Sequence, residues 1–355
     1  MRGWGARRHQ GRARRIVFAG PVPVTALALL LLTACSDDSP SVLRPRSEAA
    51  ERVEGLWWLT FWTSVVVVLL VTAFIVQAVR RGRAVAAEDA EQGAEEGIDT
   101  RPVPWGPPFI VIAGLVVSGA VLAGTFVVSL RTLDALAGPS GDPALTIEVI
   151  GRNWWWEVRY PNGAVTANEI HIPVGRTVEV KLSTADVIHS FWVPQLNVKQ
   201  DQVPGMDNRI ELLAKEPGRY RGQCAEYCGL QHARMVVYVE AEPPEQFDQW
   251  LAREAAPAAA PTSPTASTGR DILLRSSCAG CHTVRGTSAA GTLGPDLTHV
   301  ASRQTIAAGT LPLERGPLAD FVRNAQEAKP GATMPPTEVA PEELSAIVDY
   351  LMGLE

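Results

Sequence analysis

Two long stretches of this sequence contain no charged residue, and each can cross a lipid bilayer as a helix. They are residues 56–79 and 109–130. An α-helix rises about 1.5 Å per residue, so a stretch of this length spans a hydrocarbon core of about 30 Å. Three tryptophans between positions 57 and 62, and Trp105 ahead of the second stretch, stand where aromatic residues meet the membrane surface. The sequence therefore predicts two transmembrane helices.

The charges beside these stretches predict their orientation. Arg80, Arg81, Arg83 and Arg101 all lie in the segment that joins the two predicted helices. Basic residues concentrate on the cytoplasmic side of membrane proteins, so this segment is predicted to be cytoplasmic. The N-terminal part and everything after residue 130 are then predicted to lie on the outer face of a bacterial cell membrane.

Residues 1–34 are typical of a secretory signal, with a basic start and a short apolar run. The run ends in Leu32-Thr33-Ala34-Cys35, which looks like a lipoprotein cleavage box. Cys35 would then be lipidated and become the mature N-terminus. An uncleaved signal anchor with an incidental cysteine is the alternative. Residues 35–138 would hold the N-terminal segment and both membrane helices.

Residues 139–254 have a different pattern of short, alternating segments rich in β-branched and aromatic residues. Turn signals such as Pro161-Asn162-Gly163 separate these segments. Several short strands at this spacing are typical of a β-sandwich or barrel. An all-β domain is therefore predicted for this part of the chain.

A cluster of sulfur and nitrogen ligands stands inside the predicted β domain. Cys224, Cys228, His232 and Met235 occur together, and His189 precedes the first of them by 35 positions. A disulfide is one interpretation of the two cysteines, because this domain lies outside the cytoplasm. It leaves the histidines and the methionine unexplained, whereas thiolates, imidazoles and a thioether are ligands that suit copper. The pattern therefore favours a copper site.

These residues resemble the motif of subunit II of the haem-copper cytochrome c oxidases, over about residues 54–252. The resemblance implies a cupredoxin domain that holds CuA, a binuclear copper centre. It also implies the ligands, which are Cys224 and Cys228 as bridging thiolates, His189 and His232 as terminal imidazoles, Met235 as a weak axial ligand and the backbone carbonyl of Glu226. Two shared thiolates let one electron delocalise over both metal ions.

The same resemblance implies roles for two further residues. The side chain of Glu226 would also reach a redox-inactive magnesium ion at the interface with subunit I. Trp154 would be the point at which electrons enter from cytochrome c, with core packing as the alternative. Many family members carry a glutamate at the start of the second helix, but residues 101–105 contain no acid. No proton-uptake residue is therefore assigned.

A second redox motif follows a linker. Residues 255–269 are rich in proline, alanine, serine and threonine, so they are predicted to form an extended tether. Beyond it, in residues 270–355, Cys278-Ala279-Gly280-Cys281-His282 is a C-x-x-C-H signature for covalent c-type haem. A thioredoxin-like C-x-x-C motif is the alternative, but it does not require His282.

This C-terminal part resembles a small, all-α class I cytochrome c. Gly294-Pro295-Asp296-Leu297 matches the loop beside the proximal histidine, and Met334-Pro335-Pro336 matches the segment that carries the distal methionine. The resemblance implies His282 and Met334 as axial ligands, a pair that raises the reduction potential. Met352 and His299 are rivals to Met334. Every cysteine then has an assignment, with Cys35 on lipid, two on copper and two on haem.

The expected architecture is multidomain, with a two-helix transmembrane hairpin, an all-β cupredoxin-like sandwich and a small all-α cytochrome c domain. The resemblance implies the electron-input subunit of a caa3-type terminal oxidase. An external donor, cytochrome c or a quinol:cytochrome c reductase, would reduce haem c, and the electron would pass through CuA to haem in subunit I. Dioxygen would be reduced to water there, with proton translocation, so this chain would have no catalytic residue of its own.

Two alternatives remain open on the sequence alone. One is the electron-transfer subunit of a CuA-containing nitric oxide reductase, and the other is a non-catalytic copper-binding assembly lipoprotein. The expected partners are subunit I, other oxidase subunits, the external donor and membrane lipid. A formal net charge of −6 argues against a nucleic-acid partner.

Overall fold

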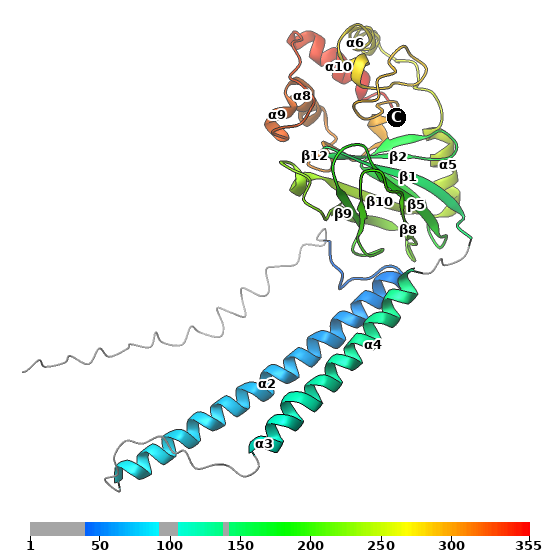
Figure 1. The fold of residues 1–355 in the computed structure, drawn as a ribbon. Coiled ribbons are helices and arrows are strands. Elements are labelled where there is room, and N and C mark those ends of the chain that lie inside the picture. The colour runs from blue at the N-terminus through cyan, green and yellow to red at the C-terminus, as the bar shows by residue number, and fades with distance from the viewer. Residues whose placement is uncertain (1–39, 92–105, 138–141) are drawn as a thin grey trace, which may run out of the picture. The chain divides into compact units, whose positions relative to one another are not determined.

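The computed structural model describes residues 40–91, 106–137 and 142–355 (Figure 1). The predicted signal and Cys35 lie outside these ranges, as do Arg101 and Trp105. Residues Pro40–Glu355 form one compact unit. Contacts between the domains of this part of the chain are therefore contacts within one unit.

Two helical segments contain the uncharged stretches. The first is α2 (Glu48–Glu91), and the second runs through α3 (Gly106–Phe109), the π-helical segment η1 (Ile110–Val117) and α4 (Ser118–Ala137). Leu69 is 63% exposed and Leu122 is 70% exposed, which is unfavourable in water but favourable in lipid. Glu48–Ala84 and Val111–Ala137 are long and apolar enough to cross a membrane, as predicted. The protein is anchored in a membrane through these helices.

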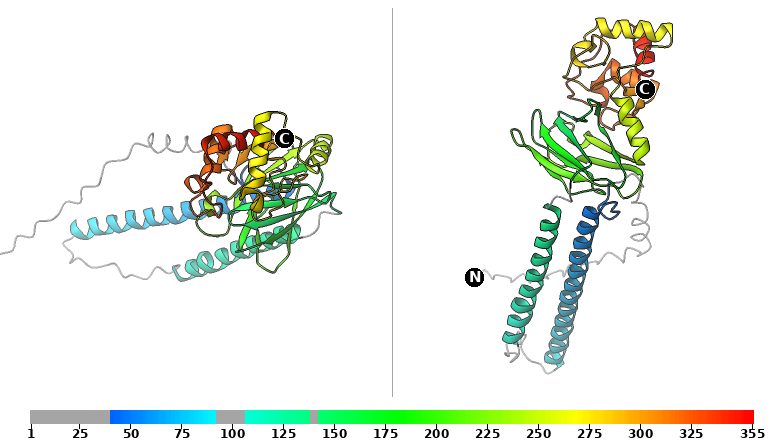
Figure 2. Two further views of the ribbon diagram at one scale, coloured as in Figure 1. Left: turned by 90° about the horizontal axis from the view of Figure 1, so that it is seen from above. Right: turned by 90° about the vertical axis from the view of Figure 1, so that its right-hand side faces the viewer.

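The two membrane helices lie side by side in both views (Figures 1 and 2). The rings of Phe74 and Phe109 meet edge to face, with centroids 5.4 Å apart. α2 is longer than its uncharged stretch because the basic and alanine-rich residues after Val79 are good helix formers. The apolar pattern thus predicts the membrane-spanning part of the helix but not where the helix ends.

Residues 145–242 fold into two five-stranded sheets, with the strand orders β3-β2-β1-β5-β8 and β4-β10-β9-β6-β7. The strands are β1 (Leu145–Arg152), β2 (Trp155–Arg159), β3 (Val165–Ala167), β4 (Glu169–Pro173), β5 (Val178–Thr184), β6 (His189–Trp192), β7 (Gln200–Gln202), β8 (Asn208–Leu212), β9 (Gly218–Cys224) and β10 (Val236–Glu242). Paired strands run antiparallel, except that β1 is parallel to β5 and β4 is parallel to β10.

One apolar core lies between the two sheets. Trp156 and Val180 come from the first sheet, and Phe191 and Val239 come from the second, and all four are fully buried. The rings of Trp156 and Phe191 meet edge to face with centroids 5.5 Å apart. This arrangement is the β-sandwich that the alternating segments predicted.

Three strands, β3, β4 and β7, were not recognised in the sequence. β3 and β7 have three residues each, which is shorter than the run that strand patterns require. β4 contains Glu169, whose carboxylate is only 2% exposed. Its burial depends on amide donors at Gln304 and Thr305, 135 and 136 positions away, so no local pattern could reveal it.

A helix joins the sandwich to the C-terminal domain. α5 (Pro244–Glu254) packs Phe247 and Trp250 into the sandwich core. The next helix, α6 (Pro264–Arg275), begins at a cap in which Ser263 accepts a hydrogen bond from the amide of Ala266. Residues 264–269 are therefore helical where the composition predicted extended linker, because a side-chain cap can start a helix of low apolar content.

The C-terminal domain is mainly helical, as predicted. It contains α6, α7 (Cys278–Cys281), η3 (Val300–Ser302), β11 (Thr305–Ile306), β12 (Leu311–Pro312), α8 (Arg315–Arg323), α9 (Ala325–Ala328) and α10 (Pro341–Leu351). α6 crosses α10 so closely that a Cβ on Gly269 would lie 1.8 Å from the carbonyl oxygen of Ala346. Leu273, Ile347 and Tyr350 fill the core beside this crossing.

Candidate metal centre and haem site

Strand ends bring the sulfur and imidazole residues together. β9 ends at Cys224, β10 begins at Val236, and residues 224–235 between them are named here the cysteine loop. The amide of Cys224 donates to the carbonyl of Met235 at 2.9 Å, so the two ends of this loop are adjacent. β6 begins at His189 and pairs with β9, with Phe191 opposite Cys224. His189 therefore lies beside the loop.

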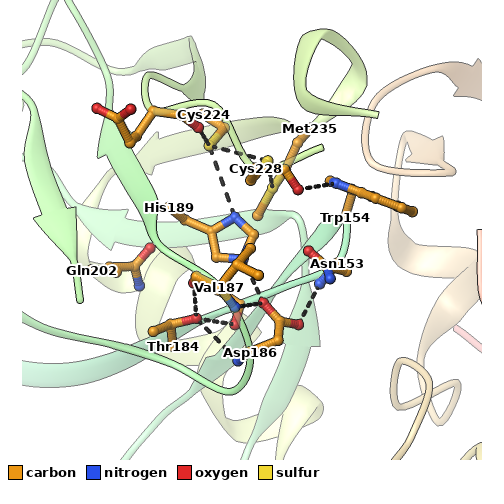
Figure 3. Close-up of polar contacts among 12 residues, drawn as sticks. Asn153, Trp154, Thr184, Asp186, Val187, His189, Gln202, Cys224, Cys228 and Met235 are labelled. Carbon is orange, nitrogen blue, oxygen red and sulfur yellow. Dashed lines mark hydrogen bonds and ion pairs between the residues drawn. The ribbon is translucent and has the colours of Figure 1, made fainter. Parts of the chain in front are cut away.

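Five side chains form a continuous cluster, of which Figure 3 labels four. The sulfur atoms of Cys224 and Cys228 are 3.8 Å apart. His189 Nδ1 lies 3.9 Å from the first sulfur, and His232 Nδ1 lies 3.7 Å from the second. The Sδ atom of Met235 is 3.9 Å from Cys228 Sγ. His189, Cys224 and Cys228 could hold a metal ion, and the other two residues extend this donor set.

The two cysteines of the loop are free thiols. Their sulfur separation of 3.8 Å is far longer than the roughly 2.05 Å of a disulfide. The hydrogen bond from Cys228 lowers the pKa of Cys224, and the same hydrogen bond raises the pKa of Cys228. One of the sulfurs is therefore readily available as a thiolate, which is the form that binds metal ions.

Asp186 orients His189. Its Oδ1 atom is 2.8 Å from His189 Nε2, which leaves Nδ1 facing the cysteines (Figure 3). Asp186 also accepts hydrogen bonds of 2.7 Å from the amides of Asn153 and Val187. Burial opposes ionisation of Asp186, but these hydrogen bonds outweigh it, and the net pKa is lowered. An ionised carboxylate behind a histidine ligand raises the basicity of the ligand.

The pKa of His189 reflects the same contacts. Burial lowers it, but the hydrogen bonds to Asp186 and Cys224 outweigh burial and raise the net pKa. Behind the ring, a Cβ on Gly151 would lie only 2.7 Å from His189 Cδ2. Sequence reasoning missed both Asp186 and Gly151. An aspartate three positions before the histidine was the one local signal that could have found the first.

Glu226 and Trp154 lie at the edge of the cluster. The carbonyl of Glu226 is 3.2 Å from Cys224 Sγ, and its side chain, which is half-buried, accepts a hydrogen bond from the amide of Tyr227. The indole Nε1 of Trp154 donates to the carbonyl of Cys228 at 2.8 Å (Figure 3). Trp154 is half-buried, whereas Trp156 is fully buried in the core.

The C-x-x-C-H residues stand on and after α7. Cys278 and Cys281 are free, half-buried thiols at the two ends of this helix. His282 Nδ1 donates to the carbonyl of Pro295 at 2.8 Å, so Nε2 is the ring nitrogen that does not take part in this hydrogen bond. Burial lowers the pKa of His282, which favours the neutral imidazole, the form that binds metal ions. A Cβ on Gly294 would lie 2.5 Å from His282 Cε1, so the ring packs against bare backbone.

Met334 and its two rivals as axial ligand differ in their surroundings. Met334 is half-buried, and its carbonyl accepts a hydrogen bond of 3.0 Å from Gln326. Both ring nitrogens of His299 are engaged, with the carbonyls of Glu355 and Ala256, which leaves no nitrogen for iron. Met352 caps the end of α10 and packs against the core.

Two family descriptions match this chain. "Cytochrome C oxidase subunit II, periplasmic domain" matches residues 163–242, and "Cytochrome c" matches residues 266–355. The first match covers the cysteine loop and His189, and the second covers the C-x-x-C-H residues. The first family implies CuA and the second implies haem c.

Relatives match over almost the whole length. Cytochrome c oxidase subunit 2 of Alkalihalophilus pseudofirmus is 32% identical over 337 residues, which are 94% of this chain and 96% of the relative. The subunit 2 of Bacillus subtilis is 28% identical over 345 residues, or 93% and 96% of the two chains. The crystal structure of the periplasmic domain of subunit II of Bradyrhizobium japonicum cytochrome oxidase is 30% identical and covers 32% of this chain and 95% of that one, with a TM-score of 0.31.

The full-length match includes the membrane helices, the sandwich with its thiol and imidazole cluster, and the helical domain with its C-x-x-C-H motif. The chain therefore belongs to the cytochrome c oxidase subunit 2 family, as an electron-transfer subunit II of a haem-copper oxidase with a fused cytochrome c domain.

Proposed function

We propose that this subunit takes electrons from an external donor at haem c and passes them through CuA to haem in subunit I, where dioxygen is reduced to water with proton translocation. The observation that carries the proposal is the cluster of two thiols, two imidazoles and a thioether, joined by contacts of 3.7 to 3.9 Å. Soft donors in this number suit copper. The full-length match to oxidase subunits favours this role over the nitric oxide reductase and assembly-lipoprotein alternatives.

The cluster fits a binuclear copper centre. Cys224 and Cys228 would bridge the two ions, and His189 and His232 would each bind one of them through Nδ1. Met235 and the carbonyl of Glu226 would complete the site as weak ligands. When bound, the copper pair supplies one-electron redox chemistry. Asp186 would hold the ring of His189 in place, and the buried strands around it would restrict movement of the ligands.

The C-terminal domain fits a covalent haem. Cys278 and Cys281 would bond its vinyl groups, and His282 and Met334 would be its axial ligands. The carbonyl of Pro295 would keep His282 Nδ1 protonated, so that Nε2 is the iron ligand. When bound, haem c supplies a one-electron centre of raised potential. The engaged ring of His299 supports Met334 over this rival.

The remaining assignments complete the proposal. Cys35 would be lipidated, and the copper and haem domains would lie on the outer face of a bacterial cell membrane. The side chain of Glu226 would contribute to a magnesium site at the interface with subunit I. Trp154 would be the point at which electrons reach the copper domain, which its hydrogen bond to the carbonyl of Cys228 supports.

A Cys228→Ser variant of the purified complex tests the copper assignment. Loss of one bridging thiolate should abolish the mixed-valence EPR signal in which one electron couples to two copper nuclei. Haem c in the same sample should remain reducible, which is the internal control. Survival of the delocalised signal would contradict the ligand set.

A matched pair of variants tests the haem assignment. Met334→Ala should abolish the sulfur-to-iron charge-transfer band of haem c, whereas Met352→Ala should leave it unchanged. The opposite result would transfer the axial role to Met352.

A pyridine haemochrome spectrum of the complex identifies the catalytic partner. Haem a beside haem c would support the oxidase. Haem b and haem c without haem a would contradict a caa3-type complex.

A further inference from the structure

A loop of the haem domain lies directly on the cysteine loop. Residues 328–334, which end in Met334, are named here the methionine loop. Arg234 Nη1 donates to the carbonyl of Ala328 at 2.6 Å, and Gln231 Nε2 donates to the carbonyl of Pro330 at 2.8 Å. Gln231 is only 4% exposed. The two loops that would carry the copper and haem ligands are therefore joined by direct hydrogen bonds.

Lys329 is the buried centre of this contact. Its side chain belongs to the haem domain, yet its Nζ atom donates to two carbonyls of the copper domain, Trp154 at 2.8 Å and Arg234 at 3.1 Å. The residue is 4% exposed, which is rare for a lysine without a close partner. Burial lowers its pKa to about 7. A purely apolar contact could hold the two domains together without the free-energy cost of burying an amine.

Trp154 is a second connection between Lys329 and the sulfur cluster. The carbonyl of Trp154 accepts the hydrogen bond from Lys329, and the indole of Trp154 donates to the carbonyl of Cys228 at 2.8 Å (Figure 3). Gly229 lies against the same indole, because a Cβ there would be 3.1 Å from Trp154 Cζ2. The methionine loop, Trp154 and the cysteine loop thus form one series of contacts.

Other contacts hold the haem domain farther from the cluster. Glu169 accepts hydrogen bonds from Gln304 and Thr305, and Arg285 donates to the carbonyl of Gly163. These contacts can keep the domain docked without fixing the methionine loop. The role of Lys329 is therefore local, and its loss should not release the whole domain.

We propose that Lys329 is a positioning residue, which holds the methionine loop against Trp154 and the cysteine loop and so sets the path for electron transfer from haem c to CuA. The inference rests on the proposed function, because it requires both centres. Each transfer oxidises haem c by one electron and reduces CuA by one electron. Lys329 gains and loses nothing in this step; it fixes the geometry in which the step occurs.

The test uses the whole purified oxidase complex with Lys329→Met, which keeps an unbranched side chain of similar length but cannot donate. Rapid photoreduction of haem c, followed by the rise of the CuA absorption band, measures the internal transfer rate. We expect this rate to fall about tenfold, equivalent to about 1.4 kcal/mol. The rate from the external donor to haem c should not change. Lys181→Met, on an exposed position of β5, is the matched control.

Reduction potentials of both centres, measured in the same samples, separate geometry from driving force. A tenfold slower internal transfer at unchanged potential difference supports positioning by Lys329. A wild-type rate with both spectra intact would overturn the proposal. If the methionine variant does not assemble, Lys329→Gln, which keeps a neutral donor on a shorter stem, should show an intermediate rate. Absence of CuA or haem c bands in the native complex would instead contradict the proposed function.

Discussion

Removal of the carboxylate behind His189 should weaken copper binding without removing a ligand. Asp186 accepts three hydrogen bonds of 2.7 to 2.8 Å, from His189 and from the amides of Asn153 and Val187. Residues that orient a metal ligand in this way typically contribute 10- to 100-fold to metal affinity. At about 1.4 kcal/mol for each factor of ten, the range is about 1.4 to 2.8 kcal/mol.

Replacement of Asp186 by asparagine and by alanine should give losses of copper affinity at opposite ends of this range. Asp186→Asn keeps an oxygen that can accept one hydrogen bond but loses the charge, so we expect a loss of about tenfold in copper affinity. Asp186→Ala also loses the two amide contacts that shape the turn before β6, so we expect up to about 100-fold. The Asp186 side chain is 29% exposed, so water can partly replace the contacts that the asparagine variant loses. The smaller loss of copper affinity is therefore expected for Asp186→Asn.

Competition for copper with a chelator of known affinity measures this effect. The optical and EPR signals of CuA report how much copper remains bound. Haem c absorption in the same sample reports that the complex is intact. Asp207→Asn, an exposed aspartate of the same domain, is the matched control. If Asp186→Ala retained copper as tightly as the native protein, the reasoning that Asp186 orients His189 for copper would be refuted.

Three further substitutions test the packing of the haem domain and its contact with the sandwich. Gly294→Ala places a Cβ 2.5 Å from His282 Cε1, so the ring should be displaced and the haem c absorption spectrum should shift toward a high-spin form. Gly269→Ala places a Cβ 1.8 Å from the carbonyl oxygen of Ala346. The free energy of unfolding of the haem domain should therefore fall by about 1–3 kcal/mol. Thermal melts monitored by haem circular dichroism should show this as a lower midpoint. Glu169→Ala removes a buried acceptor of two haem-domain amides and should cost about 1–3 kcal/mol in the same melt.

Each of these predictions has a clear contrary outcome. Gly316→Ala, where a Cβ would meet nothing within 4 Å, is the control for the two glycine variants of the haem domain. An unchanged haem spectrum in Gly294→Ala, or a native midpoint in Gly269→Ala, would show that the backbone can shift to admit the methyl group. An unchanged melting midpoint in Glu169→Ala would show that water forms hydrogen bonds with the amides of Gln304 and Thr305 in place of the carboxylate.

Much of the architecture was predictable because its signals are local. Residues 56–79 and 109–130 predict membrane helices by their length and lack of charge alone. The short strands β3 and β7 and the start of α6 were missed. In these cases a partner strand or a single cap decides the structure, and neither leaves a periodic pattern.

The proposed ligand set is likewise predictable from the sequence. Four of the five clustered residues lie within the cysteine loop, and the haem thiols and His282 lie within five positions. A short segment can bring such residues together with little loss of chain entropy, so their spacing carries the chemistry. His189 lies 35 positions before Cys224 and reaches the cluster because β6 pairs with β9.

Only the tertiary structure decided what surrounds those ligands. It made Asp186 the partner of His189, buried Glu169 beneath the haem domain and joined Lys329 to the carbonyl of Trp154 across 175 positions of sequence. Glu169 and Lys329 meet groups that lie 135 and 175 positions away in the sequence. A charged residue that will be buried at such a meeting looks like any surface residue in the sequence, because the groups that satisfy it belong to a distant part of the chain.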